Sequence, residues 1–147
     1  MRCSVSVNIA GGLFKKMKLT AVRDILQKLF EINKKIDYYT ILINSTSKPE
    51  NEVHTGLHKN PNEILIVKKV DKEIEREKLL TKLPNIRYRL QHEIREAELD
   101  EYVKAVLELY YVECLSIRDI TERIHYEKTR VGELKKQGEK KWTNSGQ

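Results

Sequence analysis

Apolar residues recur along the first third of the chain at helical spacing. Between Thr20 and Ile43 the intervals alternate between three and four residues, which is an unbroken heptad pattern. The seam consists of Val22, Ile25, Leu29, Ile32, Ile36, Tyr39 and Ile43. It predicts one long helix with Thr20 as its N-cap, roughly 35 Å in length at about 1.5 Å per residue. Two interpretations fit this seam: a core within the chain, and an oligomerisation interface in a coiled-coil homodimer.

A second amphipathic segment begins at Glu63, where Asn62 is suited to the N-cap. Its inward positions are predicted to be Ile64, Val67, Val70 and Ile74. Pro84 interrupts the pattern, and a proline inside a helix costs roughly 3 kcal/mol. The apolar line resumes directly afterwards, so we expect a kinked or restarted helix to about Ala97. The two segments predict an antiparallel hairpin, joined by a mobile loop at 44–62 that is rich in Ser, Asn and Pro.

A third helix is predicted from Glu101 to Glu113, with Asp100 as its N-cap. Its buried side should consist of Val103, Val106, Leu107, Tyr110 and Tyr111. Because this helix directly precedes two shorter apolar patterns, we expect it to support them.

Those two patterns lie within LSIRDITERIHYEKTRVGELKK, residues 115–136. Ile117, Ile120 and Ile124 predict a two-turn helix, and the Ser116 side chain is placed to accept the N–H of Asp119. The pattern breaks at residues 125–126 and restarts with Val131 and Leu134. Two short amphipathic helices joined by a turn of three to four residues are typical of a helix-turn-helix.

A second helix of this kind enters the DNA major groove, and its outward side chains contact base edges. The residues predicted to face away from Val131 and Leu134 are Lys128, Thr129, Gly132, Glu133 and Lys136. Lys is suited to guanine and Glu to cytosine. Flexible cations that serve phosphates are expected at Arg118, Arg130, Lys135, Lys140 and Lys141. The alternative is a helical pair that only packs, and Trp142 likewise either stacks on DNA or packs inside the protein.

The segment 115–136 resembles region 4 of the bacterial sigma-70 factors. A helical pair followed by such a unit resembles the ArpU-like group of phage late-gene regulators and related streptococcal phage proteins. The resemblance implies a sigma-like helix-turn-helix that acts with host RNA polymerase at late-gene promoters. Three positions depart from the family pattern: Thr121 replaces a small Ala, His125 replaces the Gly of the turn, and Glu127 replaces a Ser or Thr cap. His125 is compatible with the left-handed conformation of such a turn, because His is among the residue types enriched there.

The charge distribution favours an acidic partner for the C-terminal part. The formal net charge is +6, and residues 114–147 carry eight basic and five acidic side chains. Residues 63–113 carry ten basic and twelve acidic side chains, which indicates a surface facing solvent or protein. This acidic middle keeps a protein-binding alternative open: an antirepressor, or an inhibitor of host RNA polymerase or of a defence nuclease such as a CRISPR effector.

No pattern in the sequence indicates catalysis, a cofactor or a metal centre. Cys3 and Cys114 lie far apart without a CxxC partner, which is typical of a reduced cytosolic chain. His54 and His58 have the spacing of helical metal ligands, but they lie in a predicted loop without a third ligand nearby. No apolar run approaches the about 20 residues that span a membrane. We therefore expect a cytoplasmic protein that is not an enzyme.

These patterns predict an all-α chain with four segments. Residues 1–16 form a flexible extension, because Met17 begins a stretch typical of a natural start. Residues 17–99 form the helical hairpin, residues 100–142 the helix-turn-helix with a weak point at Gly138, and residues 143–147 a frayed tail. The predicted function is sequence-specific regulation of transcription by a homodimer bound to double-stranded DNA.

Overall fold

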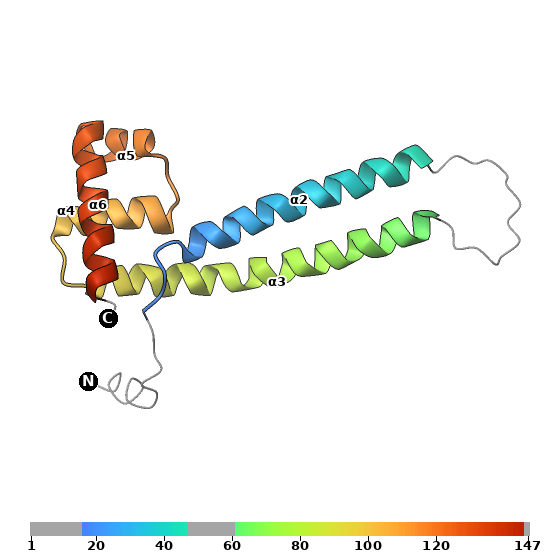
Figure 1. Cartoon of the computed structure of the whole chain (residues 1–147), viewed down its shortest axis with the longest axis horizontal. Coiled ribbons are helices and arrows are strands. Elements are labelled where there is room, and N and C mark those ends of the chain that lie inside the picture. The colour runs from blue at the N-terminus through green and yellow to red at the C-terminus, as the bar shows by residue number, and fades with distance from the viewer. Residues whose placement is uncertain (1–15, 47–60, 146–147) are drawn as a thin grey trace, which may run out of the picture. The chain divides into compact units, whose positions relative to one another are not determined.

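The computed structural model describes residues 16–46 and 61–145, and this part of the chain is all-α (Figure 1). Two long helices come first, α2 (Ala21–Thr46) and α3 (Pro61–Glu96). Then follow α4 (Glu101–Leu107), the π-helix η1 (Glu108–Val112), α5 (Ile117–Ile124) and α6 (Lys128–Ser145). Within the described ranges there is no strand, which confirms the predicted fold class. Cys3, His54 and His58 lie outside the described residues.

The chain divides into two compact units. The hairpin unit is Asp24–Pro84, and the described part of the second unit, here called the head unit, comprises residues 16–23 and 85–145. Helix α3 continues through Pro84 instead of restarting after it. Proline lacks the N–H that would bond back into the helix, so the division falls where α3 is intrinsically weakened. The predicted division at residue 100 therefore differs from the observed one by about four helical turns.

The core of the hairpin unit is the predicted heptad seam of α2. Ile25, Leu29, Ile32 and Ile36 are each less than 10% exposed within the single chain, and Val22 is buried in the head unit. Tyr39 and Ile43 are partly buried. Five of the seven seam residues are therefore already covered, and their assignment to an interface between two copies is corrected. The seam is an internal core because α3 returns alongside α2 and occupies it (Figure 1).

The orientation of α3 also differs from the prediction. Its predicted inward residues Ile64, Val67, Val70 and Ile74 are 46%, 59%, 42% and 50% exposed. The side of α3 turned inward carries the partly buried Leu65, Leu79 and Leu83. Arg76 lies on that side as well and donates to Asn33 Oδ1 of α2 at 3.0 Å. Because α3 has apolar residues on opposite sides, spacing alone did not select the face that packs.

Three helix ends lie beyond their predicted positions. Helix α2 continues to Thr46, and α3 begins at Pro61, so Asn62 is inside the helix and is not its cap. Proline is favoured at the first helical position because its missing N–H has no partner there anyway. Helix α6 continues to Ser145, where a frayed tail was predicted from Thr143. The Thr143 hydroxyl donates to the Glu139 carbonyl at 3.0 Å within this last turn.

The core of the head unit is formed by apolar residues from all of its helices. Those less than 3% exposed are Val22, Leu90, Ile94, Val103, Val106, Leu107, Ile120, Val131 and Leu134. Asp100 caps α4 as predicted, since its carboxylate accepts the N–H of Tyr102 at 3.2 Å. Trp142 is 6% exposed and its indole N–H donates to the Met17 carbonyl at 3.0 Å. The packing interpretation of Trp142 is therefore confirmed.

The third predicted helix changes type after Leu107. In η1 the N–H of Glu113 bonds to the carbonyl of Glu108, five residues earlier, at 3.0 Å. The wider turn accommodates one extra residue and so rotates the buried face. Leu109 and Val112 become buried beside Tyr111, whereas the predicted core residue Tyr110 is only partly buried.

At Gly138 α6 packs closely against α4. A Cβ at this position would lie 2.8 Å from Val103 Cγ1 and 2.8 Å from Leu107 Cδ1, closer than real Cβ contacts. The predicted weak point is thus a contact that only glycine permits, and α6 continues through it. Gly132 differs, because a Cβ there would meet nothing within 4 Å.

These two glycines provide a matched test of the packing. Gly138→Ala should lower the free energy of unfolding by about 1–3 kcal/mol, the usual cost of overpacking. Gly132→Ala should leave it unchanged or raise it by up to about 1 kcal/mol, because alanine is the better helix former. Urea unfolding followed by circular dichroism measures both variants. Equal effects of the two substitutions would contradict the close approach at Gly138.

Candidate nucleic-acid interface

Local capping fixes both ends of α5. The Ser116 hydroxyl accepts the N–H of Asp119 at 3.1 Å, as the sequence predicted. At the other end His125 has φ 61° and ψ 36°, and its N–H donates to the Thr121 carbonyl at 2.8 Å. This is the left-handed conformation with which His125 is compatible. Three residues, 125–127, then connect α5 to α6.

Helix α6 has one buried and one exposed line of residues. Val131, Leu134, Gly138 and Trp142 are buried at intervals of three and four residues. On the other side of the helix, Thr129, Glu133, Lys136 and Lys140 are exposed at the same kind of interval, and we call them the outward line. Because α4 and α5 both pack on the buried side, the rotation of α6 about its axis is set by its core.

Three of the five predicted base-contacting residues belong to the outward line: Thr129, Glu133 and Lys136. Lys128 is exposed as the first residue of α6, beside this line. Gly132 lies at the flank of the line and is partly buried. The fold therefore brings all five into the first three turns of one helix, which is the length a major groove accommodates.

The exposed cations around the line differ in how they are paired. Arg118 on α5 lies 3.6 Å from Glu122, and Arg130 lies 3.5 Å from Glu133. Such exposed pairs contribute little and exchange readily for another anion. Lys128 and Lys140 are both exposed. Lys141 is also exposed, next to Trp142.

Lys135, a predicted phosphate contact, has its charge directed at partners within the chain. Its ammonium lies 2.7 Å from Glu139 and 4.6 Å from the centre of the Tyr110 ring, and its side chain is only 22% exposed. The interval of one residue from Lys136 turns it toward the two aromatic rings of η1, and Glu139 of α6 pairs with its charge. Its role at phosphates stays a prediction, and in this structure its charge is directed at Glu139 and Tyr110.

This contact is part of a polar cluster that holds α6, η1 and the start of α2 together. The Tyr111 hydroxyl donates to Glu139, which also accepts from Lys135. Arg23 lies over the Tyr110 ring at 3.8 Å and donates to the Tyr110 carbonyl at 2.9 Å. A second donor of Arg23 reaches the Leu115 carbonyl at 3.2 Å, just before α5. Hydrogen bonds to charged groups are stronger than neutral ones. The cluster therefore helps to fix the positions of α5 and α6, on the side of α6 that is turned toward η1.

Two pKa values reflect this cluster. Burial raises the pKa of Glu139, but hydrogen bonds from Lys135 and Tyr111 outweigh burial, so the pKa lies below its usual value. Burial, and then the hydrogen bond to Glu139, raise the pKa of the Tyr111 hydroxyl. Glu139 is therefore ionised and Tyr111 protonated at neutral pH, which is the combination that keeps both hydrogen bonds.

Sequence patterns did not single out two exposed residues beside the interface. Gln137 follows Lys136 on the outer side of α6, and Arg123 on α5 is 57% exposed, 3.7 Å from Glu113. Arg123 had a signal, because it is the basic residue in the last turn of α5. The role of Arg23 in the polar cluster left no signal in the sequence, since its partners are 87 and 92 residues away.

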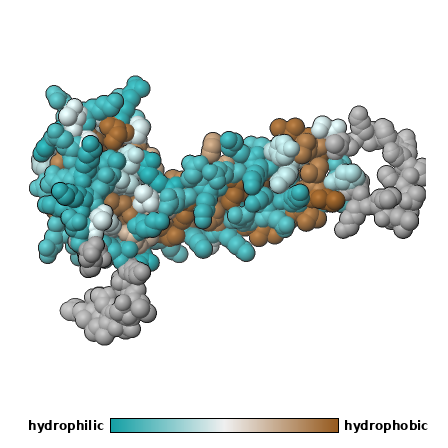
Figure 2. All heavy atoms as spheres, in the orientation of Figure 1, coloured by the Kyte–Doolittle hydropathy of each residue, from teal (hydrophilic) through white to brown (hydrophobic). Residues whose placement is uncertain are grey.

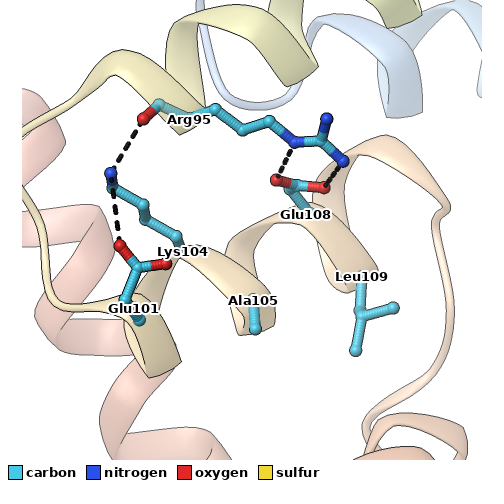
Figure 3. Close-up of a pocket in the computed structure, with 6 residues that line it drawn as sticks. All are labelled: Arg95, Glu101, Lys104, Ala105, Glu108 and Leu109. Carbon is cyan, nitrogen blue, oxygen red and sulfur yellow. Dashed lines mark hydrogen bonds and ion pairs between the residues drawn. The ribbon is translucent and has the colours of Figure 1, made fainter.

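A hollow of about 490 Å³ opens elsewhere on the head unit, lined by residues from the end of α3, from α4 and from η1. Figure 3 shows Arg95 and Glu108 facing each other with two hydrogen bonds, at 2.9 and 3.3 Å. Lys104 donates to the Arg95 carbonyl at 2.8 Å and lies 3.8 Å from Glu101. Each charged side chain of this hollow thus has a partner within it, and the outward line of α6 is the better candidate site.

Comparison with known protein families, with curated proteins and with solved structures found no match. Among the described helices, none has the length and apolar character needed to cross a membrane. Within residues 16–46 and 61–145, no cluster of three or more His, Cys, Asp or Glu side chains is arranged to hold a metal ion.

The cluster predicts a pH dependence of stability. Because the folded-state pKa of Glu139 is lowered, its ionised form adds stability that is complete above the unfolded pKa of about 4.3. That contribution is lost as the pH falls through the folded value. Glu139→Gln should therefore cost less than about 1 kcal/mol at pH 7, since the pair is partly exposed. The difference from the unsubstituted chain should shrink below about pH 4.3. Urea unfolding across this pH range measures it, and a difference that grows toward low pH would refute the assignment.

Proposed function

We propose that this protein is a sequence-specific regulator of transcription that binds double-stranded DNA through α5 and α6 as a helix-turn-helix. The observation that carries the proposal is the outward line of α6, Thr129, Glu133, Lys136 and Lys140. It is polar over three turns and lies on a helix whose buried side is fixed by the core. A helix held in this way, with polar ends directed outward, is suited to the major groove.

The side chains of the line divide into two roles. Lys136 and Lys128 are suited to the O6 and N7 acceptors of guanine, and Glu133 to the amino group of cytosine. Lys140, Lys141 and Arg118 flank these positions and are suited to phosphates, which fix the register without specifying sequence. The five acidic side chains among residues 114–147 would repel phosphates unless each is directed at a base or paired with a cation. Arg118 and Arg130 provide such pairing.

The biological setting in this proposal follows from the resemblance of residues 115–136 to sigma-70 region 4. The protein would act in the cytoplasm of a bacterial host, at phage or mobile-element late promoters, together with host RNA polymerase. It would need no cofactor and no catalytic step, because occupancy of a promoter is its whole action.

A second candidate function is binding to a host protein in place of DNA. It is favoured by the acids on this surface, since Glu122 and Glu133 are exposed and partly neutralise the neighbouring arginines. A polar surface of mixed sign is more typical of a protein partner than of DNA. The target would be a polymerase, a repressor or a defence nuclease. Capture of one such protein from host lysate in equal amounts, surviving nuclease treatment, would favour this candidate.

The first test of DNA binding removes the two cations assigned to bases. Lys128→Ala with Lys136→Ala should weaken binding to the preferred promoter duplex by tenfold or more, at about 1–3 kcal/mol for each good base contact. Helicity by circular dichroism should not change, because both side chains are exposed. Fluorescence titration against promoter and random duplexes measures the effect. Lys28→Ala with Lys35→Ala is the control, since it removes the same charge from exposed positions of α2.

Retained affinity in the first variant would refute the assignment of α6. Equal losses in the two variants would show that only total charge matters. No binding of any duplex by the unsubstituted chain at low salt would overturn the DNA proposal itself.

A second test distinguishes Lys135 from Lys140, two lysines of α6 that were both predicted to contact phosphates. Lys140→Ala should lower the slope of log affinity against log salt concentration by about 0.9, the value for one lost phosphate contact. Lys135→Ala should leave that slope unchanged and lower the midpoint of thermal unfolding, because Lys135 is held by Glu139. Titrations at several salt concentrations and a melting curve measure both. A lower slope for Lys135→Ala with an unchanged melting midpoint would show that Lys135 contacts a phosphate.

A further inference from the structure

The fold does not restrict position 132 of α6 to glycine. A Cβ built on Gly132 would meet nothing within 4 Å, whereas one on Gly138 would lie 2.8 Å from Val103 and Leu107. The backbone of Gly132 is helical, so no left-handed conformation requires glycine either. Glycine is also the poorest helix former after proline. Helix α6 therefore carries an unfavourable residue at a position where its own packing would accept alanine.

Basic side chains border the open space over Gly132. The residues three and four positions away, which are the nearest neighbours on a helix surface, are Lys128, Thr129, Lys135 and Lys136. There is no acid among them. None of their side-chain atoms comes within 4 Å of the built Cβ, so they surround the space without filling it. We call this space and its four border residues the Gly132 notch.

Both acids of α6 are paired with other side chains. Glu133 lies 3.5 Å from Arg130, which is about 160° around the helix from the notch. Glu139 lies 2.7 Å from Lys135 and accepts a hydrogen bond from the hydroxyl of Tyr111 in η1. The other two lysines of the notch are exposed. The acids of α6 thus leave these exposed lysines accessible to a partner with negative charge.

We propose that double-stranded DNA comes closest to α6 at the Gly132 notch, where the surface of the duplex contacts the helix backbone directly. This close contact rests on the proposed function and specifies which side of α6 faces the floor of the groove. Exposed cations attract a polyanion, and glycine is the residue that lets a backbone approach a ligand closely. Figure 2 shows mostly hydrophilic side chains on the visible face of the head unit. Charge and close fit, and not apolar burial, therefore recognise the partner.

The notch lies to one side of the outward line. Gly132 is about 70° around the helix from the middle of that line, and Lys136 belongs to both surfaces. Lys128 and Lys136 lie on either side of the glycine, about 12 Å apart along the helix axis. Both lysines can therefore reach base edges beside the point of closest contact, as their proposed roles require. Glu133, about 100° around the helix from Gly132, is turned away from that point.

Gly132→Ala tests this contact by adding one methyl group. It should weaken binding to the preferred duplex by about tenfold, as an extra methyl group in a close-packed contact does. Gly132→Leu fills the notch with a longer side chain and should weaken binding further. Fluorescence titration of the full chain against promoter and random duplexes measures both variants. Their midpoints of thermal unfolding should be unchanged or raised, because alanine and leucine are better helix formers than glycine, so unfolding cannot explain the loss.

Asn85→Leu is the control, since it also replaces a poor helix former with leucine, at an exposed position of α3, and should leave binding unchanged. A loss confined to the promoter duplex would place a base edge at the notch, and an equal loss on all duplexes would place the sugar–phosphate backbone there. Undiminished binding by Gly132→Ala, or an equal loss with Asn85→Leu, would overturn the close contact and leave the proposed function standing. If the unsubstituted chain binds no duplex, the proposed function fails and the contact with it.

Discussion

At Gly138 the backbone of α6 approaches α4 so closely that a Cβ would lie 2.8 Å from Val103 and Leu107. This distance determines how the rest of the head unit is arranged. It seats Val131, Leu134 and Trp142 in the core and thereby leaves Thr129, Glu133, Lys136 and Lys140 outside. Because side chains in a core interdigitate, α6 has little freedom to rotate once these contacts form. The candidate interface is therefore set by the side of α6 that packs in the core.

Polar contacts at the end of α6 and at the start of α5 stabilise the same arrangement. The indole of Trp142 bonds to the Met17 carbonyl, and the N–H of Met17 donates to Glu93 at 2.9 Å. Arg23 bonds to carbonyls on either side of the end of η1. Partners far apart in sequence thus hold the end of α6 and the start of α5. Half-buried bonds of this kind add specificity to a fold whose free energy comes mainly from apolar burial.

Local signals in the sequence predicted local structure well. The Asp100 and Ser116 caps and the left-handed His125 each depend on residues within four positions, and all three are present. Spacing also identified α2 and the exposed line of α6. It failed where the outcome depends on a distant neighbour. The side of α3 that packs, the contact of Lys135 with Tyr110 and the close contact at Gly138 are each decided by residues far away in the chain.

The two glycines of α6 illustrate this limit. Both occur in a helix, and composition gives each the same expected cost of about 1 kcal/mol relative to alanine. Only the neighbour distinguishes them, because Gly132 meets open space and Gly138 meets α4. Likewise the heptad seam of α2 was equally compatible with an internal core and an oligomer. The return of α3 alongside it decided between them.

The π-helix Glu108–Val112 holds one residue more than an α-turn would. Loss of one residue here would close the wide turn to an ordinary α-turn and leave the segments before and after it in their present directions. The same deletion in an α-turn, such as that of α4, would rotate everything downstream by about 100°. The wide turn is therefore the place in the head unit where the chain best absorbs the loss of a single codon.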